Sequence, residues 1–124
     1  MAIKNLSAVD FETTIADSPI VLIDFWASWC GPCRAFAPVF DRSAQSHPDV
    51  VHAKVDTQAQ QQLAAALEIQ SIPTIMAFRD GILVYRQPGA MPAAALEDLI
   101  TRIKALDMAD VRAKIAAQKA GAAQ

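Results

Sequence analysis

Phe25–Cys33 reads FWASWCGPC. It joins an apolar run, Ile20–Trp26, to two cysteines that are separated by two residues. An apolar run rich in branched residues is typical of a central strand covered on both faces. A Cys-x-x-Cys pair that follows a strand and opens a helix is typical of a redox-active dithiol, because one helical turn brings the two sulfurs within bonding reach. We therefore expect Cys30 and Cys33 to interconvert between dithiol and disulfide.

The composition of the 124-residue chain predicts one domain with one core, because 53% of the residues are hydrophobic. A net charge of −2 gives no electrostatic footprint for nucleic acid or for an anionic membrane surface. No apolar stretch approaches membrane-spanning length, and Met1–Ser7 contains no uninterrupted apolar run of the kind found in secretory signals. We therefore expect a cytoplasmic protein, in a compartment that keeps thiols reduced and so favours a catalytic pair over a structural bridge.

The hydrophobic pattern predicts an alternation of strands and helices. Ser7 and Asp10 form a capping-box signal for a first helix, whose core face is expected to carry Val9, Phe11 and Ile15. Strands are expected at 4–6, 20–26, 50–55, 74–78 and 82–86, and helices from residue 7 to the Ser18-Pro19 stop, from the cysteines to about residue 47, at 58–67 and from residue 92.

Two proline and glycine signals refine this order. Pro38 lies inside the second expected helix and should kink it, because proline has no N–H to bond back one turn. Arg79-Asp80-Gly81 is a strong turn signal between the last two strands, which are expected to form a hairpin. Parallel strand-helix units are therefore expected first, followed by an antiparallel pair.

The motif Trp29-Cys30-Gly31-Pro32-Cys33, with Asp24 in the preceding strand and Ile72-Pro73-Thr74 downstream, resembles the thioredoxin family over most of the chain, to about Leu106. The resemblance implies an α/β thioredoxin fold: a mixed five-stranded sheet with a four-stranded core, flanked by helices on both faces. It divides the chain into a thioredoxin domain, 1–106, and a helical C-terminal extension, 107–124. We expect the extension to pack on the body or to fray from Gly121, with Met108, Val111 and Ile115 on one helical face.

The resemblance also implies catalytic roles. Cys30 would be the exposed nucleophile that forms a mixed disulfide with a substrate protein, and Cys33 the resolving thiol that releases the product. Asp24 interrupts a strand that otherwise looks buried, and an unpaired buried carboxylate is costly or takes up a proton. By resemblance Asp24 would relay the Cys33 proton, and Lys54 would moderate its charge from the neighbouring strand. The alternative for Lys54 is a strand-end lysine that extends its amine to solvent.

A substrate-binding surface around Cys30 is implied in the same way. An X-Pro bond is trans by default, whereas the resemblance implies a cis bond before Pro73 that faces the cysteines and leaves the Ile72 backbone free to pair with an extended substrate. Trp26 is expected in the core or behind the surface, and Ser28 and Pro88 depart from the acidic and branched residues common at these positions. The residues expected to form the surface are Trp29, Gly31, Pro32, Ile72, Pro73, Gly89 and Ala90.

A zinc site is the alternative for the cysteines, because Cys30-x2-Cys33-x13-His47-x4-His52 fits the spacing of a Cys2His2 finger. The context argues against it, since Pro48 separates the histidines and His52 falls in an expected strand. We therefore expect no metal and no other bound cofactor, the redox group being the Cys30–Cys33 disulfide itself. His47 and His52 are expected to be ordinary surface or strand-end residues.

The implied function is reduction of protein disulfides by a monomer that a flavin- and NADPH-dependent thioredoxin reductase recycles. The implied substrates are ribonucleotide reductase, peroxiredoxins and methionine sulfoxide reductases. Two other functions stay open. An oxidase or isomerase of the same fold is disfavoured by Gly31-Pro32, because a histidine there would stabilise the thiolate and make a better oxidant. A redox-independent interaction module would use the fold as a clamp and residues 107–124 for docking.

Overall fold

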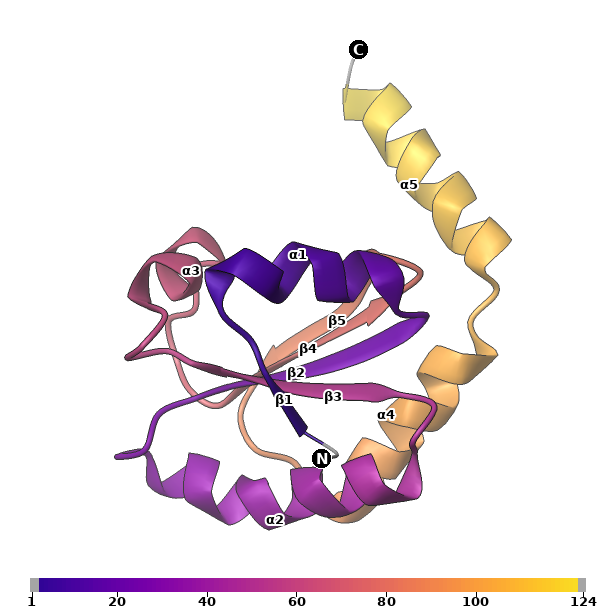
Figure 1. Cartoon of the computed structure of the whole chain (residues 1–124). Helices are drawn as coiled ribbons and strands as arrows, with labels where there is room; N and C mark the ends of the chain where they lie inside the picture. The colour runs from indigo at the N-terminus through magenta and orange to yellow at the C-terminus, as the bar shows by residue number, and fades with distance from the viewer. Residues whose placement is uncertain (1–2, 123–124) are drawn as a thin grey trace.

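A mixed sheet of five strands forms the centre of the computed structural model, which describes residues 3–122 (Figure 1). The strand order is β1-β3-β2-β4-β5, with β1, β3 and β2 parallel and β4 and β5 antiparallel to their neighbours. The strands are β1 (Ile3–Asn5), β2 (Ile20–Trp26), β3 (Val51–Asp56), β4 (Thr74–Arg79) and β5 (Ile82–Pro88). The helices are α1 (Ala8–Asp17), α2 (Gly31–Ser46), α3 (Gln61–Ala66), α4 (Ala93–Ala105) and α5 (Met108–Ala122). This architecture confirms the predicted fold class.

Two hydrophobic layers sandwich the sheet. Figure 1 shows α1 and α3 on one face and α2 and α4 on the other. Because successive side chains of a strand point to opposite faces, β2 contributes Val21, Ile23 and Phe25 to the layer under α1. It contributes Ile20 and Leu22 to the layer under α2 and α4. The even-numbered positions of β2 therefore face α2, the helix that the cysteines open.

The first helix begins as predicted but buries a different stripe. The Ser7 backbone N–H donates to Asp10 Oδ1 at 2.7 Å, which completes the capping box. Phe11 and Ile15 are buried, but Val9 is 91% exposed, so its expected place on the core face was wrong. Val9 precedes Phe11 by two residues, and two residues correspond to about 200° around a helix. The stripe set by Phe11 and Ile15 therefore turns Val9 to solvent.

The turn and the proline signals have different outcomes. Asp80 and Gly81 connect β4 to β5 with positive φ angles of 52° and 80°, the conformation that an Asp-Gly hairpin turn requires. Pro38 lies inside α2, which nevertheless continues as one helix to Ser46.

Among residues 3–122, the helices are all too short or too polar to cross a membrane.

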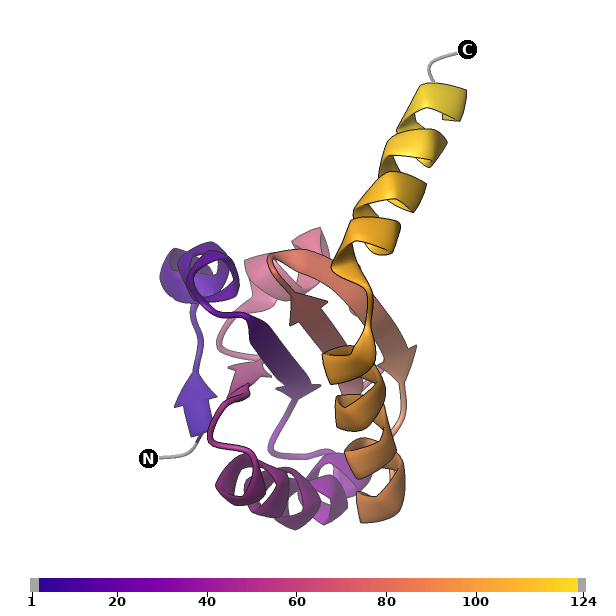
Figure 2. The ribbon, with the colours of Figure 1, turned by 90° about the vertical axis from the view of Figure 1, so that its right-hand side faces the viewer.

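The helix α5 packs on the body along its N-terminal half. Met108 is 7% exposed, whereas Val111 and Ile115 are half-buried and the described side chains beyond them are exposed. Arg79 Nη1 donates to the carbonyls of Ile103, Lys104 and Leu106 at 2.7, 3.1 and 2.9 Å, which ties the α4–α5 connection to β4. Figures 1 and 2 show the rest of α5 projecting away from the sheet.

Candidate active site

The two cysteines lie where β2 gives way to α2. Cys30 is the N-cap of α2, and its Sγ accepts a hydrogen bond from the Cys33 backbone N–H at 3.2 Å. Cys30 and Cys33 form a disulfide with their Cα atoms 5.2 Å apart. The amide that contacts Cys30 Sγ and the positive end of the helix dipole both favour a thiolate at this position after reduction. The local fold thus gives the two sulfurs different surroundings.

Cys30 is less accessible than the sequence suggested. In the disulfide form Cys30 is 4% exposed and Cys33 is 3% exposed, so the expectation of an outward-facing Cys30 was wrong for this state. Cys30 Sγ lies 3.6 Å from the Ile72 carbonyl oxygen, which comes from a loop 42 residues away. Long-range packing of this loop covers the sulfur. The neighbouring Trp29 is 64% exposed.

The loop before β4 meets the cysteines as the resemblance implied. The Ile72–Pro73 peptide bond is cis, Pro73 is buried and Ile72 is half-buried. The Gly89 N–H donates to the Pro73 carbonyl at 2.7 Å and brings the β5–α4 loop alongside. Gly89 has a φ of +102°, which favours glycine. The exposed Gly31 and Pro32 begin α2, and the exposed Ala90 follows Gly89. The predicted surface residues therefore come from the β2–α2 connection with the first residues of α2, the loop before β4 and the loop after β5.

The buried carboxylate of Asp24 is on the face of the sheet that α2 covers. Asp24 is 0% exposed, and neither of its oxygens has a hydrogen-bond partner among the described residues. The strand register pairs Asp24 with Lys54 of β3, and Lys54 Nζ lies 4.0 Å from Asp24 Oδ2. Burial raises the pKa of Asp24 to about 6, although the Lys54 charge lowers it. Asp24 can therefore exchange a proton close to neutral pH, as a general acid or base must.

Lys54 is held between the carboxylate and an aromatic ring. Its Nζ lies 4.7 Å from the Trp26 ring centroid, and 16% of its side chain is exposed. Trp26 is half-buried, as expected, and its Nε1 has no hydrogen-bond partner among the described residues. The contact between Lys54 and Trp26 is a cation–π arrangement that sequence analysis did not identify. Lys54 and Trp26 lie on the neighbouring strands β3 and β2, and the register of these strands brings them together.

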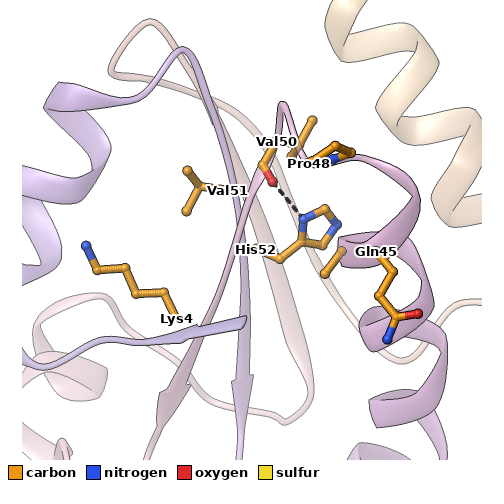
Figure 3. Close-up of a pocket in the computed structure, with 7 residues that line it drawn as sticks. Lys4, Gln45, Pro48, Val50, Val51 and His52 are labelled. Carbon is orange, nitrogen blue, oxygen red and sulfur yellow. Dashed lines mark hydrogen bonds between the residues drawn. The ribbon is translucent and has the colours of Figure 1, made fainter. Parts of the chain in front are cut away.

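His52 also differs from its expected position. It lies near the start of β3, but it is 1% exposed and its ring lies between β3 and α2 (Figure 3), so the expectation of a surface residue was wrong. Nδ1 lies 3.0 Å from the Val50 carbonyl and Nε2 lies 2.8 Å from Ser43 Oγ. Because a carbonyl only accepts, Nδ1 carries the hydrogen and Nε2 accepts from Ser43. Burial lowers the pKa of His52 and so favours the neutral ring.

The hollow beside His52 is remote from the cysteines. It has a volume of about 440 Å³, and Lys4, Gln45 and Val51 are among its lining residues. Val51 pairs with Val21 at the start of β2, whereas the cysteines follow the end of that strand. The other histidine, His47, bonds Glu97 on the surface at 2.8 Å. Among residues 3–122, no three His, Cys, Asp or Glu side chains converge on a possible metal position.

Comparisons with known proteins agree with this geometry. The thioredoxin family model matches residues 2–102. Putative thioredoxin 2 of Streptomyces coelicolor is 50% identical over 118 residues, covering 95% of this chain and 88% of the relative. A variant thioredoxin from Halobacterium salinarum superposes with a TM-score of 0.78 at 33% identity, covering 84% of this chain and 92% of that one. A structure on thiol resolution in a yeast mitochondrial 1-Cys peroxiredoxin through glutathione and thioredoxin systems gives a TM-score of 0.74 at 32% identity, with coverage of 81% and 94%.

Proposed function

Because this chain belongs to the thioredoxin family of protein-disulfide oxidoreductases, we propose that it acts as a reductant of protein disulfides through Cys30 and Cys33. The observation that carries the proposal is the contact between Cys30 Sγ and the Cys33 N–H at 3.2 Å. This contact places Cys30 Sγ where a thiolate is stabilised, whereas Cys33 lies one turn into α2. Such an asymmetry suits a thiol that attacks and a thiol that resolves.

The proposed reaction has two exchanges. The Cys30 thiolate attacks one sulfur of the substrate disulfide, forms a mixed disulfide and releases the other substrate sulfur as a thiolate, which takes a proton from solvent. Cys33 then loses its proton and attacks Cys30 Sγ, which forms the Cys30–Cys33 disulfide and releases the second substrate thiolate. The substrate gains two electrons and the cysteine pair loses two.

Asp24 is the proposed acceptor of the Cys33 proton. Its pKa of about 6 makes it mostly ionised, and so able to accept, at neutral pH. Lys54, 4.0 Å from Asp24 Oδ2, would hold the pKa of the acid below the value that burial alone would produce. Lys54 therefore acts through Asp24 in this proposal and does not touch the reacting sulfurs.

The proposed substrate surface consists of residues that surround Cys30 and present small or apolar groups. The Ile72 backbone would pair with an extended segment of the substrate by strand addition, and Gly31 and Gly89 allow close approach of another backbone. The full proposed set is Trp29, Gly31, Pro32, Ile72, Pro73, Gly89 and Ala90.

The proposed cycle needs an external electron source. A flavin-dependent thioredoxin reductase that draws on NADPH would re-reduce the Cys30–Cys33 disulfide, and the chain would work as a monomer in the cytoplasm, where thiols are kept reduced. Peroxiredoxins, ribonucleotide reductase and methionine sulfoxide reductases are the proposed acceptors. The similarity to a chain from the peroxiredoxin structure supports the first of these. No bound cofactor is required by the proposed exchanges.

The test is turnover of a disulfide substrate with NADPH and a bacterial thioredoxin reductase. We expect steady NADPH consumption with the natural chain, none with Cys30→Ser, and a trapped mixed disulfide with Cys33→Ser that mass spectrometry detects. Absence of turnover with a reductase that accepts other thioredoxins would contradict the reductant role. Full complementation in cells by Cys33→Ser would instead favour a redox-independent interaction module, and net oxidation of dithiol substrates would favour an oxidase.

A further inference from the structure

Arg34 follows the second cysteine and folds back over the segment that carries the first. Its Nη1 donates to the Ser28 carbonyl at 3.0 Å. Its Nη2 lies 3.9 Å from the point that a Cβ on Gly31 would occupy. Ser28 and Gly31 flank Cys30 closely in the chain, so two independent distances place the guanidinium beside the attacking residue. The charge does not extend freely into solvent as that of an unanchored surface arginine would.

The Arg34 guanidinium forms no ion pair with a described acidic side chain. Within residues 3–122, the ion pairs with an N···O distance of 4.0 Å or less do not include Arg34. Residue 28, which touches Arg34, is a serine and contributes no charge. The bond to Ser28 uses one of the five N–H donors of the arginine, and the planar fork of the remaining donors matches a carboxylate. Arg34 therefore has both the charge and the donors to bind an acidic group from another molecule.

The other surface residues around Cys30 give no competing charge. Trp29 is 64% exposed, and Pro32, Ala90 and the half-buried Ile72 add apolar surface. A partner that lies across this surface meets one fixed positive charge at its edge. Opposite charges that meet at the rim of an interface raise association rates and select partners more than they raise affinity.

We propose that Arg34 is a specificity residue that selects disulfides flanked by an aspartate or glutamate. The acidic side chain accepts hydrogen bonds from the Arg34 guanidinium while the adjacent cysteine sulfur lies at Cys30. This inference rests on the proposed reductant function and adds the chemical class of the preferred substrate. Because the pair forms at an exposed site, the preference is a modest one, roughly 1.5-fold to fivefold in kcat/KM, and salt weakens it.

The experiment compares two synthetic peptides that each contain one intramolecular disulfide and differ only in a Glu or a Gln next to the cysteine under attack. Pre-reduced protein is mixed with each peptide, and the rate of peptide reduction is followed at low and at high salt. The variants are Arg34→Gln and Arg34→Glu. Arg42→Glu is the matched control, because Arg42 is an exposed arginine two helical turns further along α2. Thermal unfolding of each variant verifies that it is folded.

We expect the natural chain and Arg42→Glu to favour the Glu peptide, Arg34→Gln to lose the preference and Arg34→Glu to reverse it. Equal rates on both peptides with the natural chain would overturn the proposal. An equal loss of rate on both peptides in Arg34→Gln would also overturn it, because this result would assign Arg34 to activation of the Cys30 thiolate. Failure of the natural chain to reduce either peptide would count against the reductant function itself.

Discussion

Lys54 Nζ lies 4.0 Å from Asp24 Oδ2, at a distance too long for a hydrogen bond, and Asp24 has no hydrogen-bond partner among the described residues. The positive charge of Lys54 therefore offsets part of the free-energy cost of burying the Asp24 carboxylate, without a hydrogen bond to the carboxylate oxygens. A group in this situation binds a proton more readily than an exposed carboxylate does.

Replacement of Asp24 by asparagine is expected to stabilise the protein at neutral pH. The ordinary pKa of an aspartate is 3.8, and burial raises the pKa of Asp24 in the folded chain to about 6. Between these values the folded chain holds more protons than the unfolded chain, so the free energy of unfolding falls as pH rises from about 4 to about 6. The difference corresponds to about 3 kcal/mol at 1.36 kcal/mol per pKa unit. Asp24→Asn removes this loss of stability, because an asparagine side chain does not ionise.

Urea unfolding at pH 4 and pH 7 measures this effect. Asp24→Asn should be up to about 3 kcal/mol more stable than the natural chain at pH 7, and this difference between the two chains should shrink towards pH 4. Asp41→Asn, which removes an exposed carboxylate from α2, is the control and should change stability by less than about 0.5 kcal/mol. A lower stability of Asp24→Asn at pH 7 would be the contrary result.

Lys54→Met is expected to raise the pKa of Asp24 above about 6, because it removes the charge that lowers this pKa. The methionine keeps most of the aliphatic length that packs near Trp26. A ¹³C NMR titration of the Asp24 carboxyl carbon measures the change directly. Lys4→Met, on the exposed edge strand β1, is the matched control and should leave the titration unchanged. An unaltered midpoint in Lys54→Met would show that the lysine does not act on the acid.

Ser43→Ala is expected to destabilise the protein by about 1–3 kcal/mol, because it leaves the buried Nε2 of His52 without a donor. The exposed Ser46→Ala on the same helix provides the control, with an effect below about 0.5 kcal/mol. Urea unfolding at pH 7 compares the two variants. Similar stabilities of Ser43→Ala and Ser46→Ala would show that the buried hydrogen bond contributes nothing measurable.

His52 also gives stability a pH dependence opposite to that of Asp24. Its pKa is lowered in the folded chain from the ordinary value of 6.5, so the unfolded chain binds more protons as pH falls below 6.5. The stability that depends on the neutral ring is therefore present above pH 6.5 and lost as pH falls through the lowered pKa. In Asp24→Asn, where the carboxylate no longer contributes, stability should decrease on acidification below pH 6.5.

Removal of residues 107–124 is expected to leave disulfide reduction intact and to lower stability. Met108 is the only buried residue in the described part of this segment, and burial of a methionine contributes about 2 kcal/mol. Met108→Ala in the full chain should reproduce most of the loss, and Ile115→Ala, at a half-buried position, should cause less. Urea unfolding and peptide reduction measure both properties. Loss of reduction on truncation would mean that the extension belongs to the functional unit.

Much of the fold was predictable because the relevant signals are local. The capping box joins Ser7 to a residue three positions away, and the turn at Asp80-Gly81 depends on the left-handed conformation of adjacent residues. Strand alternation and the Cys30–Cys33 spacing are also read over a few residues. The position of Val9 was predicted wrongly because all the buried residues of a helix together set its rotation about its axis. One apolar residue does not set this rotation.

Some features of the candidate site are likewise set by local sequence, and others by tertiary packing. The sequence alone determined the strand, the helix that Cys30 caps and the one-turn spacing of the sulfurs, because covalent geometry and neighbouring residues decide these features. The resemblance implied that the Ile72–Pro73 bond faces the cysteines and that Lys54 lies near Asp24, but the cause of both contacts is tertiary. Only the tertiary structure showed that His52 is buried against Ser43. Each of these contacts depends on strand register and loop packing. Register and packing come from the summed burial of the whole core, which no short stretch of sequence contains.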